Sequence, residues 1–148
     1  MSATEEKSVP QRPLPDLDDP ISAPFYRAAR DGIVQFQKCA NCGYLRWPSA
    51  PICPECWSDQ FAWSEVAPTG TIWSFVGYHR AFNPAFTDML PYVVALVELD
   101  AGPQMISNIV GVPEEELAVG MRVTAVFEPF GEEALVNFVP ERPEGGAR

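Results

Sequence analysis

Four cysteines arranged as two pairs constrain this chain more than any other sequence feature. Cys39 and Cys42 form the first pair, Cys53 and Cys56 form the second, and ten residues separate the pairs. Two residues within each pair allow one turn to point both thiolates at the same ion, and two such turns complete a closed tetrahedral site of the kind that holds structural zinc. Gly43 follows the first pair, where a metal-binding turn often needs a positive φ. The spacing therefore predicts one structural zinc ion on these cysteines.

Other uses of the cysteines fit the sequence less well. Two disulfides would require an oxidising compartment, and a redox pair would be a single motif beside a βαβ unit. An iron site of the rubredoxin type uses the same four ligands and stays an alternative. Because four protein ligands leave no open coordination position, we expect the metal to contribute folding energy and not to activate water.

A short helix is expected ahead of the cysteines, over residues 22–32. Ser22 suits its N-cap, Pro24 its first turn and Gly32 its exit. The helical period places three small or aromatic apolar residues on one face: Phe25, Ala28 and Ala29.

Extended segments dominate the rest of the chain. Short ones surround the cysteines at residues 35–38, 45–48 and 61–66, and five longer strands follow at residues 71–79, 92–99, 104–110, 122–128 and 134–140. Pro113 and the acids after it start a short helical turn between the third and fourth of these longer strands. That order is typical of an OB-type Greek-key barrel. The strand at 92–99 is nearly all apolar, so we expect both of its faces to be covered.

The predicted fold is therefore mainly β, with an N-terminal helix, a rubredoxin-like four-cysteine zinc ribbon and a five-stranded OB-fold barrel. Residues 22–66 would hold the helix and ribbon, and residues 67–140 the barrel. Proline and acidic residues predict a flexible arm over residues 1–21, and Pro, Glu and Gly predict a flexible tail over residues 141–148.

The charge balance argues against nucleic acid and anionic membranes as partners. The chain has ten Lys and Arg and twenty Asp and Glu, which gives a formal net charge of −10. Electrostatic binding of nucleic-acid phosphates requires clustered cations. The cations between the two ends are scattered: Arg27, Arg30, Lys38, Arg46, Arg80 and Arg122. No apolar run approaches the roughly 20 residues of a membrane helix, and the first residues lack the pattern of a signal peptide. We therefore expect a cytoplasmic protein.

Catalytic motifs are missing from the sequence, which has a single histidine, His79, and neither a nucleophile elbow nor a phosphate-binding glycine loop. A stand-alone enzyme is therefore not expected. One segment between the first two barrel strands has the composition of a contact site, with aromatic anchors beside a cation: Tyr78, His79, Arg80, Phe82 and Phe86. The alternative is that Phe82 and Phe86 only plug the end of the barrel.

The chain resembles a family of small bacterial and archaeal acyl-CoA-associated proteins, long known as a domain of unknown function. The resemblance covers about residues 22–140 and rests on segments that match together: Phe25–Ala29, Cys39–Gly43, Pro51–Cys56, Gly70–Ser74, His79–Arg80, Pro84–Phe86, Pro91–Leu99 and Val119–Val123. It implies a small subunit beside a thiolase-like enzyme, such as a thiolase, an acyltransferase complex or a steroid side-chain aldolase. It further implies that the barrel and ribbon help to hold or pass an acyl-CoA.

The sequence is compatible with two functions that belong to different classes. The first is a non-catalytic zinc-binding subunit in a hetero-oligomer with a thiolase-fold partner, assisting acyl-CoA binding or transfer. The second is a free-standing nucleic-acid binder, because OB barrels and zinc ribbons both recur in such proteins. The absence of clustered cations favours the first. Within a composite site, His79 would serve either as a base or as a contact residue.

Overall fold

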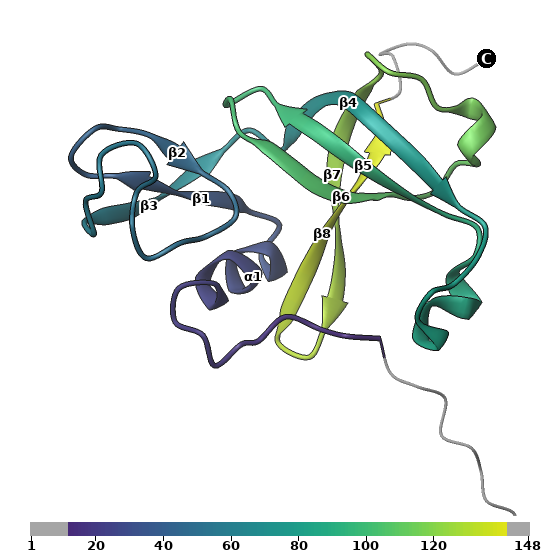
Figure 1. Ribbon diagram of the computed structural model, residues 1–148, viewed down its shortest axis with the longest axis horizontal. Helices are drawn as coiled ribbons and strands as arrows, with labels where there is room; N and C mark the ends of the chain where they lie inside the picture. The colour runs from purple at the N-terminus through teal and green to yellow at the C-terminus, as the bar shows by residue number, and fades with distance from the viewer. Residues whose placement is uncertain (1–11, 142–148) are drawn as a thin grey trace, which may run out of the picture.

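The computed structural model describes residues 12–141 and places a helix, a small sheet and a closed barrel along the chain (Figure 1). The helix is α1 (Ala23–Arg30), and the small sheet holds β1 (Val34–Cys39), β2 (Leu45–Arg46) and β3 (Phe61–Val66). The barrel holds β4 (Thr69–Tyr78), β5 (Tyr92–Leu99), β6 (Gln104–Ile109), β7 (Arg122–Phe130) and β8 (Glu133–Pro140). Two 3₁₀ helices interrupt it, η1 (Pro84–Met89) and η2 (Glu114–Glu116). The predicted mainly β architecture is confirmed.

Helix α1 forms where the sequence predicts it, although its N-terminus differs in detail. Ser22 makes no side-chain cap, and its hydroxyl instead donates to the Asp19 carboxylate at 2.8 Å. The carboxylate is a charged acceptor close to Ser22 and outcompetes the backbone for the hydroxyl. At the other end Gly32 takes the predicted exit position with φ +76°, and its N–H donates to the Ala29 carbonyl at 3.0 Å.

The buried face of α1 joins the ribbon to the barrel. Phe25 and Ala29 lie one turn apart and are buried, and the Phe25 ring stacks on Phe36 of β1 with centroids 6.1 Å apart. The helix lies between the ribbon and β8 (Figure 1). One hydrophobic core therefore runs from Phe36 through α1 to Phe138 and Ile72 inside the barrel.

Three antiparallel strands make the ribbon, in the order β2-β1-β3. A polar pair is buried within it. The Gln37 side-chain oxygen accepts from Arg46 Nε and from the Ala50 N–H, both at 2.8 Å, while Arg46 Nη2 donates to the Ala50 carbonyl at 3.0 Å. These bonds fasten the loop after β2, which carries the second cysteine pair.

The barrel closes in the order β4-β5-β6-β8-β7. Antiparallel ladders join most neighbours, whereas β6 and β8 meet in parallel at Ile109 and Phe138. η2 lies between β6 and β7, as the predicted helical turn does between the third and fourth barrel strands. The closure between β6 and β8 is thus the shortest seam of the barrel.

Strand β5 departs from its predicted burial. Its inward residues Val93, Ala95, Val97 and Leu99 are buried, but Val94 and Leu96 on the outer side are only partly buried. The prediction that both faces are covered is therefore wrong for the chain by itself. Around Val94 and Leu96 the outer face is apolar, and the described chain covers it only in part.

The two ends of the barrel differ. At the end where β4 and β7 begin, Arg122 Nη1 and Nη2 donate to the two Asp100 carboxylate oxygens at 2.6 and 2.7 Å. These bonds from Arg122, with a further bond from the Thr69 hydroxyl, lower the pKa of Asp100 to about 2. The opposite end, near Tyr78, Tyr92 and Ile109, is hollowed and carries the pockets described below.

The predicted arm and tail fall partly outside the described residues, which exclude residues 1–11 and 142–148. In the described part, Arg12 contacts the barrel: its Nη2 lies 2.7 Å from a Glu128 carboxylate oxygen and its Nη1 lies 3.5 Å from the sulfur of Met89. None of the helices within residues 12–141 is both long and apolar enough to cross a membrane.

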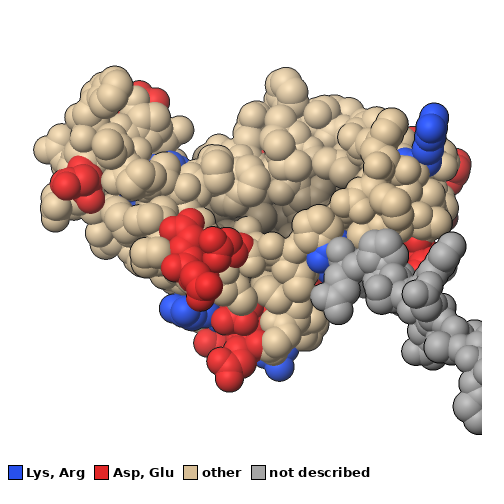
Figure 2. Space-filling model, turned by 60° about the horizontal axis from the view of Figure 1, so that its bottom comes forward, with Lys and Arg blue, Asp and Glu red and all other residues tan. Residues whose placement is uncertain are grey.

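The acidic side chains are unevenly distributed over the surface. Figure 2 shows carboxylates gathered below a hollow that separates the ribbon lobe from the barrel, whereas the cations on this face lie apart from one another. This face therefore offers no broad basic surface for a phosphate backbone.

Candidate functional site

The four cysteines come together at one end of the ribbon. All four Sγ atoms lie within 4.8 Å of one another, with Cys39 and Cys56 at 3.5 Å and Cys42 and Cys53 at 3.7 Å. Sulfur ligands about 2.3 Å from a tetrahedral zinc ion lie about 3.8 Å apart, so these separations fit the ion. The cysteines are free thiols and not disulfides.

Two equivalent turns position the thiols. Gly43 N–H donates to the Cys39 carbonyl at 3.0 Å, and Trp57 N–H donates to the Cys53 carbonyl at 2.9 Å. Both residues have positive φ, +79° at Gly43 as predicted and +66° at Trp57. A tryptophan in this region is strained, so the turn geometry imposed by the metal ligands overrides the residue's preference.

Backbone donors and neighbouring thiols pull the cysteine pKa values apart. The Cys42 N–H stabilises the Cys39 thiolate and helps to lower the pKa of Cys39 to about 6. Although the Tyr44 N–H lowers the pKa of Cys42, burial and the other three thiols raise it to about 12. Four thiolates do not coexist here without a cation, which is the charge that a divalent metal supplies.

The predicted contact segment divides between two faces of the barrel, because neighbouring strand residues point to opposite sides. Tyr78 points outward and stacks on Tyr92, with ring centroids 5.0 Å apart and planes at 12°. Phe86 packs on Tyr92 at 5.9 Å, and Arg80 lies over the exposed Phe82 ring at 5.8 Å. Phe82 is 80% exposed, so it does not plug the barrel.

These aromatic rings border an open groove of about 500 Å³ on the outer surface of the barrel. The groove continues over β5 and β6, where it is lined by Val94, Ile106 and Asn108. Val76 and Ile106 beside it are 50% and 57% exposed. We call this surface, made by Val76, Tyr78, Phe82, Phe86, Tyr92, Val94, Leu96 and Ile106, the aromatic face.

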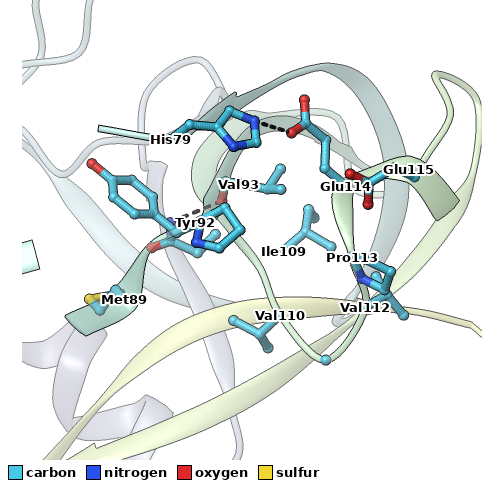
Figure 3. Close-up of a pocket in the computed structure, with 13 residues that line it drawn as sticks. His79, Met89, Tyr92, Val93, Ile109, Val110, Val112, Pro113, Glu114 and Glu115 are labelled. Carbon is cyan, nitrogen blue, oxygen red and sulfur yellow. Dashed lines mark hydrogen bonds and ion pairs between the residues drawn. The ribbon is translucent and has the colours of Figure 1, made fainter. Parts of the chain in front are cut away.

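His79 lies on the other side of the strand end and pairs with η2. Its Nε2 is 2.8 Å from a Glu114 carboxylate oxygen (Figure 3). The Glu114 carboxylate lies against Gly77, where a Cβ atom would come within 2.0–2.4 Å of its atoms. Gly77 thus makes the space into which Glu114 fits.

A second pocket of about 330 Å³ opens beside this pair. Figure 3 shows His79 and Glu114 on one side of it, with Val93 and Ile109 behind them and Val110, Val112 and Pro113 along the loop that leads to η2. Val93 and Ile109 belong to the buried core, so the pocket reaches the interior of the barrel.

Comparison with known proteins identifies both modules. Residues 27–62 match the model of the ChsH2 rubredoxin-like zinc ribbon domain, and residues 63–128 match the ChsH2 C-terminal OB-fold domain. A DUF35 domain-containing scaffold protein of Methanocaldococcus jannaschii is 33% identical over 97 residues, covering 65% of this chain and 68% of that protein. The chain belongs to the DUF35 family.

Two further relatives extend the DUF35 assignment. A probable enoyl-CoA hydratase alpha subunit of Thermomonospora curvata is 38% identical over 142 residues, which are 95% of this chain and 44% of that protein. This chain therefore spans less than half of that relative. A solved structure of an Ltp2-ChsH2(DUF35) aldolase matches with a TM-score of 0.74 and 36% identity, covering 87% of this chain and 98% of the matched one.

All four cysteines lie within the residues that match the zinc ribbon domain. The four sulfurs form the site of one structural zinc ion, as their spacing predicts. The cysteines that could hold the ion are Cys39 and Cys42 from the first turn and Cys53 and Cys56 from the second.

Sequence reasoning missed some residues of the candidate site on the barrel. It did not single out Glu114, which is 35 residues from its partner His79, because glutamates are abundant in this chain. It also missed Gly77 and Tyr92. η1 did leave a local signal, since Asn83 before Pro84 is a helix-start pattern, and the Asn83 side chain accepts from the Ala85 N–H at 2.9 Å.

Proposed function

We propose that this chain is a non-catalytic, zinc-containing subunit that binds a thiolase-fold enzyme and helps it to hold or pass an acyl-CoA. The family relatives support a role in a hetero-oligomer, since one is a hydratase alpha subunit and another belongs to an Ltp2-ChsH2(DUF35) aldolase. The thiolase fold of the partner and the acyl-CoA ligand are part of the proposal.

The observation that carries the proposal is the uncovered outer side of β5. Its sequence is that of a strand covered on both faces, yet Val94 and Leu96 are only partly buried. The neighbouring strands add Val76 and Ile106, each at least half exposed. Contiguous apolar surface of this kind marks a protein interaction site, so the partner is expected to provide the missing cover.

Aromatic rings supply the anchor for such a contact. Phe82 projects from the edge of the aromatic face, and Arg80 lies over its ring, so an apolar group and a cation are presented together. Exposed aromatic and arginine side chains at the centre of an interface typically dominate the binding energy.

Replacing Phe82 with alanine is expected to weaken assembly with the thiolase-fold partner. Loss of an anchoring aromatic typically costs about 2 kcal/mol, which corresponds to roughly a thirtyfold increase in Kd. Arg80→Ala should act in the same direction, and the metal content of both variants should stay unchanged because the ribbon is not touched. The measurement is the Kd of the purified pair, for example by titration calorimetry.

Val119→Ala is the matched control for this experiment. Val119 is an apolar side chain with 65% exposure, near the start of β7 and outside the aromatic face. It should bind the partner as the unmodified chain does. Normal assembly and turnover by both loop variants would contradict the proposed interface, and acyl-CoA turnover by the isolated chain would contradict its non-catalytic role.

A further inference from the structure

We propose that the pocket beside His79 and Glu114 is a binding site for a neutral, apolar group that carries a hydroxyl, and that His79 Nδ1 accepts the hydrogen bond from that hydroxyl. That this group is the acyl chain of a thioester rests on the proposed function. That it carries a hydroxyl is argued from the pocket itself. His79 and Glu114 lie outside the aromatic face, although Tyr92 lines both surfaces.

The hydrogen-bond acceptor is set by the pairing of the imidazole. A carboxylate only accepts, so Glu114 at 2.8 Å requires the hydrogen of the neutral ring to sit on Nε2. Nδ1 then carries the lone pair. Among the described residues no donor reaches it, and His79 lines the pocket. With the ring neutral, a ligand group that donates a hydrogen bond to Nδ1 completes this arrangement.

The position of the Glu114 side chain depends on Gly77 of β4, so its contact with His79 is more than a chance meeting of two surface side chains. A Cβ on residue 77 would overlap the Glu114 carboxylate at 2.0–2.4 Å, so the glycine is what lets the carboxylate lie against β4. Glu114 is also the first residue of η2, whose end is closed by the Leu117 N–H bonding to the Glu114 carbonyl at 3.0 Å. Strand and turn together place the Glu114 carboxylate beside the imidazole.

The residues that line the pocket disfavour negatively charged ligands. Behind the pair lie apolar side chains, among them Val93, Ile109, Val110 and Val112. Glu114 and Glu115 are the carboxylates of the lining, and no Lys or Arg among the described residues lines the pocket. These carboxylates repel phosphate and carboxylate groups. The nucleotide of an acyl-CoA would therefore lie outside the pocket, and only the neutral part of the molecule would enter it.

A matched pair of neutral probes tests the hydroxyl directly. 3-Hydroxyhexanoyl-pantetheine and hexanoyl-pantetheine differ only by the hydroxyl, so amide contacts are common to both. His79 is the single histidine of the chain, so ¹⁵N-histidine labelling gives one imidazole to follow by NMR. With the full chain alone we expect the hydroxylated probe to shift the Nδ1 resonance and to bind about fivefold tighter, the effect of one hydrogen bond at a partly exposed site.

Variants of Glu114 and Gly77 distinguish loss of the His79–Glu114 pairing from a general loss of folding. Glu114→Ala and Gly77→Ala keep His79 but remove or displace the carboxylate, so both should lose the preference for the hydroxylated probe. Glu116→Gln changes an exposed neighbour that neither lines the pocket nor contacts His79, and it should keep the preference. Amide spectra of every variant check that the barrel remains folded.

Equal affinity for the two probes, no change at His79 with either, or a preference that survives Glu114→Ala would each overturn the proposal. The proposed function fails separately. If no thiolase-fold partner binds, the probe titration on the isolated chain still reports on the pocket, and if the partner binds while the probes are not distinguished, only the pocket inference is wrong.

Discussion

Replacing Cys53 with serine is expected to remove the metal and unfold the ribbon. Cys53 is fully buried, and its Sγ lies 3.7 Å from that of Cys42, so a serine hydroxyl would leave a three-sulfur site. Structural zinc contributes about 10–16 kcal/mol of binding energy in small zinc domains, which is comparable to the whole stability of a typical protein. The barrel core would also lose order near α1, because Phe25 packs against Phe36 of the ribbon.

Elemental analysis and tryptophan fluorescence measure this outcome. Trp47 and Trp63 are partly buried and pack on the core, so their emission should shift to longer wavelength when the ribbon unfolds. Trp57 is already 81% exposed and contributes little change. A Trp57→Phe variant is the control, since it keeps all four sulfurs and should retain one zinc ion per chain. A stably folded Cys53→Ser protein without metal would contradict the structural role of zinc.

Gln37→Leu is expected to destabilise the ribbon strongly even though it introduces a larger apolar side chain into a buried position. Gln37 is fully buried and Arg46 is 3% exposed. The substitution removes the acceptor of both Arg46 Nε and the Ala50 N–H. A buried cation without its acceptor typically costs about 3 kcal/mol or more. Urea unfolding of the zinc-loaded protein measures the loss.

The double variant Gln37→Leu/Arg46→Met gives this prediction its sharpest test. Replacing both polar partners by apolar groups of similar shape removes the unpaired charge, so most of the lost stability should return. Lys38→Gln, at the exposed neighbouring position of β1, should leave the free energy of unfolding nearly unchanged. Equal stability of Gln37→Leu and the unmodified chain would show that Gln37 does not support Arg46.

The aromatic face and the His79 pocket lie on opposite sides of one strand end, and each carries one of the two proposals. Tyr78 points to the outer surface and stacks on Tyr92, while the next residue, His79, turns toward the barrel opening and pairs with Glu114. A substitution at Phe82 or at Glu114 therefore changes one surface each, whereas Tyr92 lines both. This separation makes the two proposals distinguishable by experiment.

Features that depend on a few consecutive residues could be predicted from the sequence alone. The spacing of Cys39, Cys42, Cys53 and Cys56 determined the zinc site, because each turn brings its two thiolates together locally. Gly32 and Gly43 occupy positive φ positions that glycine adopts without strain. The periodicity of the strands and the turn at Pro113 likewise predicted the barrel order.

Features that depend on contacts between distant segments were decided by the tertiary structure. His79 and Glu114 meet across 35 positions, and Gly77 matters only because β4 passes beneath that carboxylate. The buried Gln37–Arg46 pair and the strained Trp57 run against the residues' ordinary preferences. The outer side of β5 has the composition of a covered strand, and only the packed chain shows that residues 12–141 leave it partly open. Composition records which residues bury well, whereas three-dimensional packing determines which of them are left for a partner.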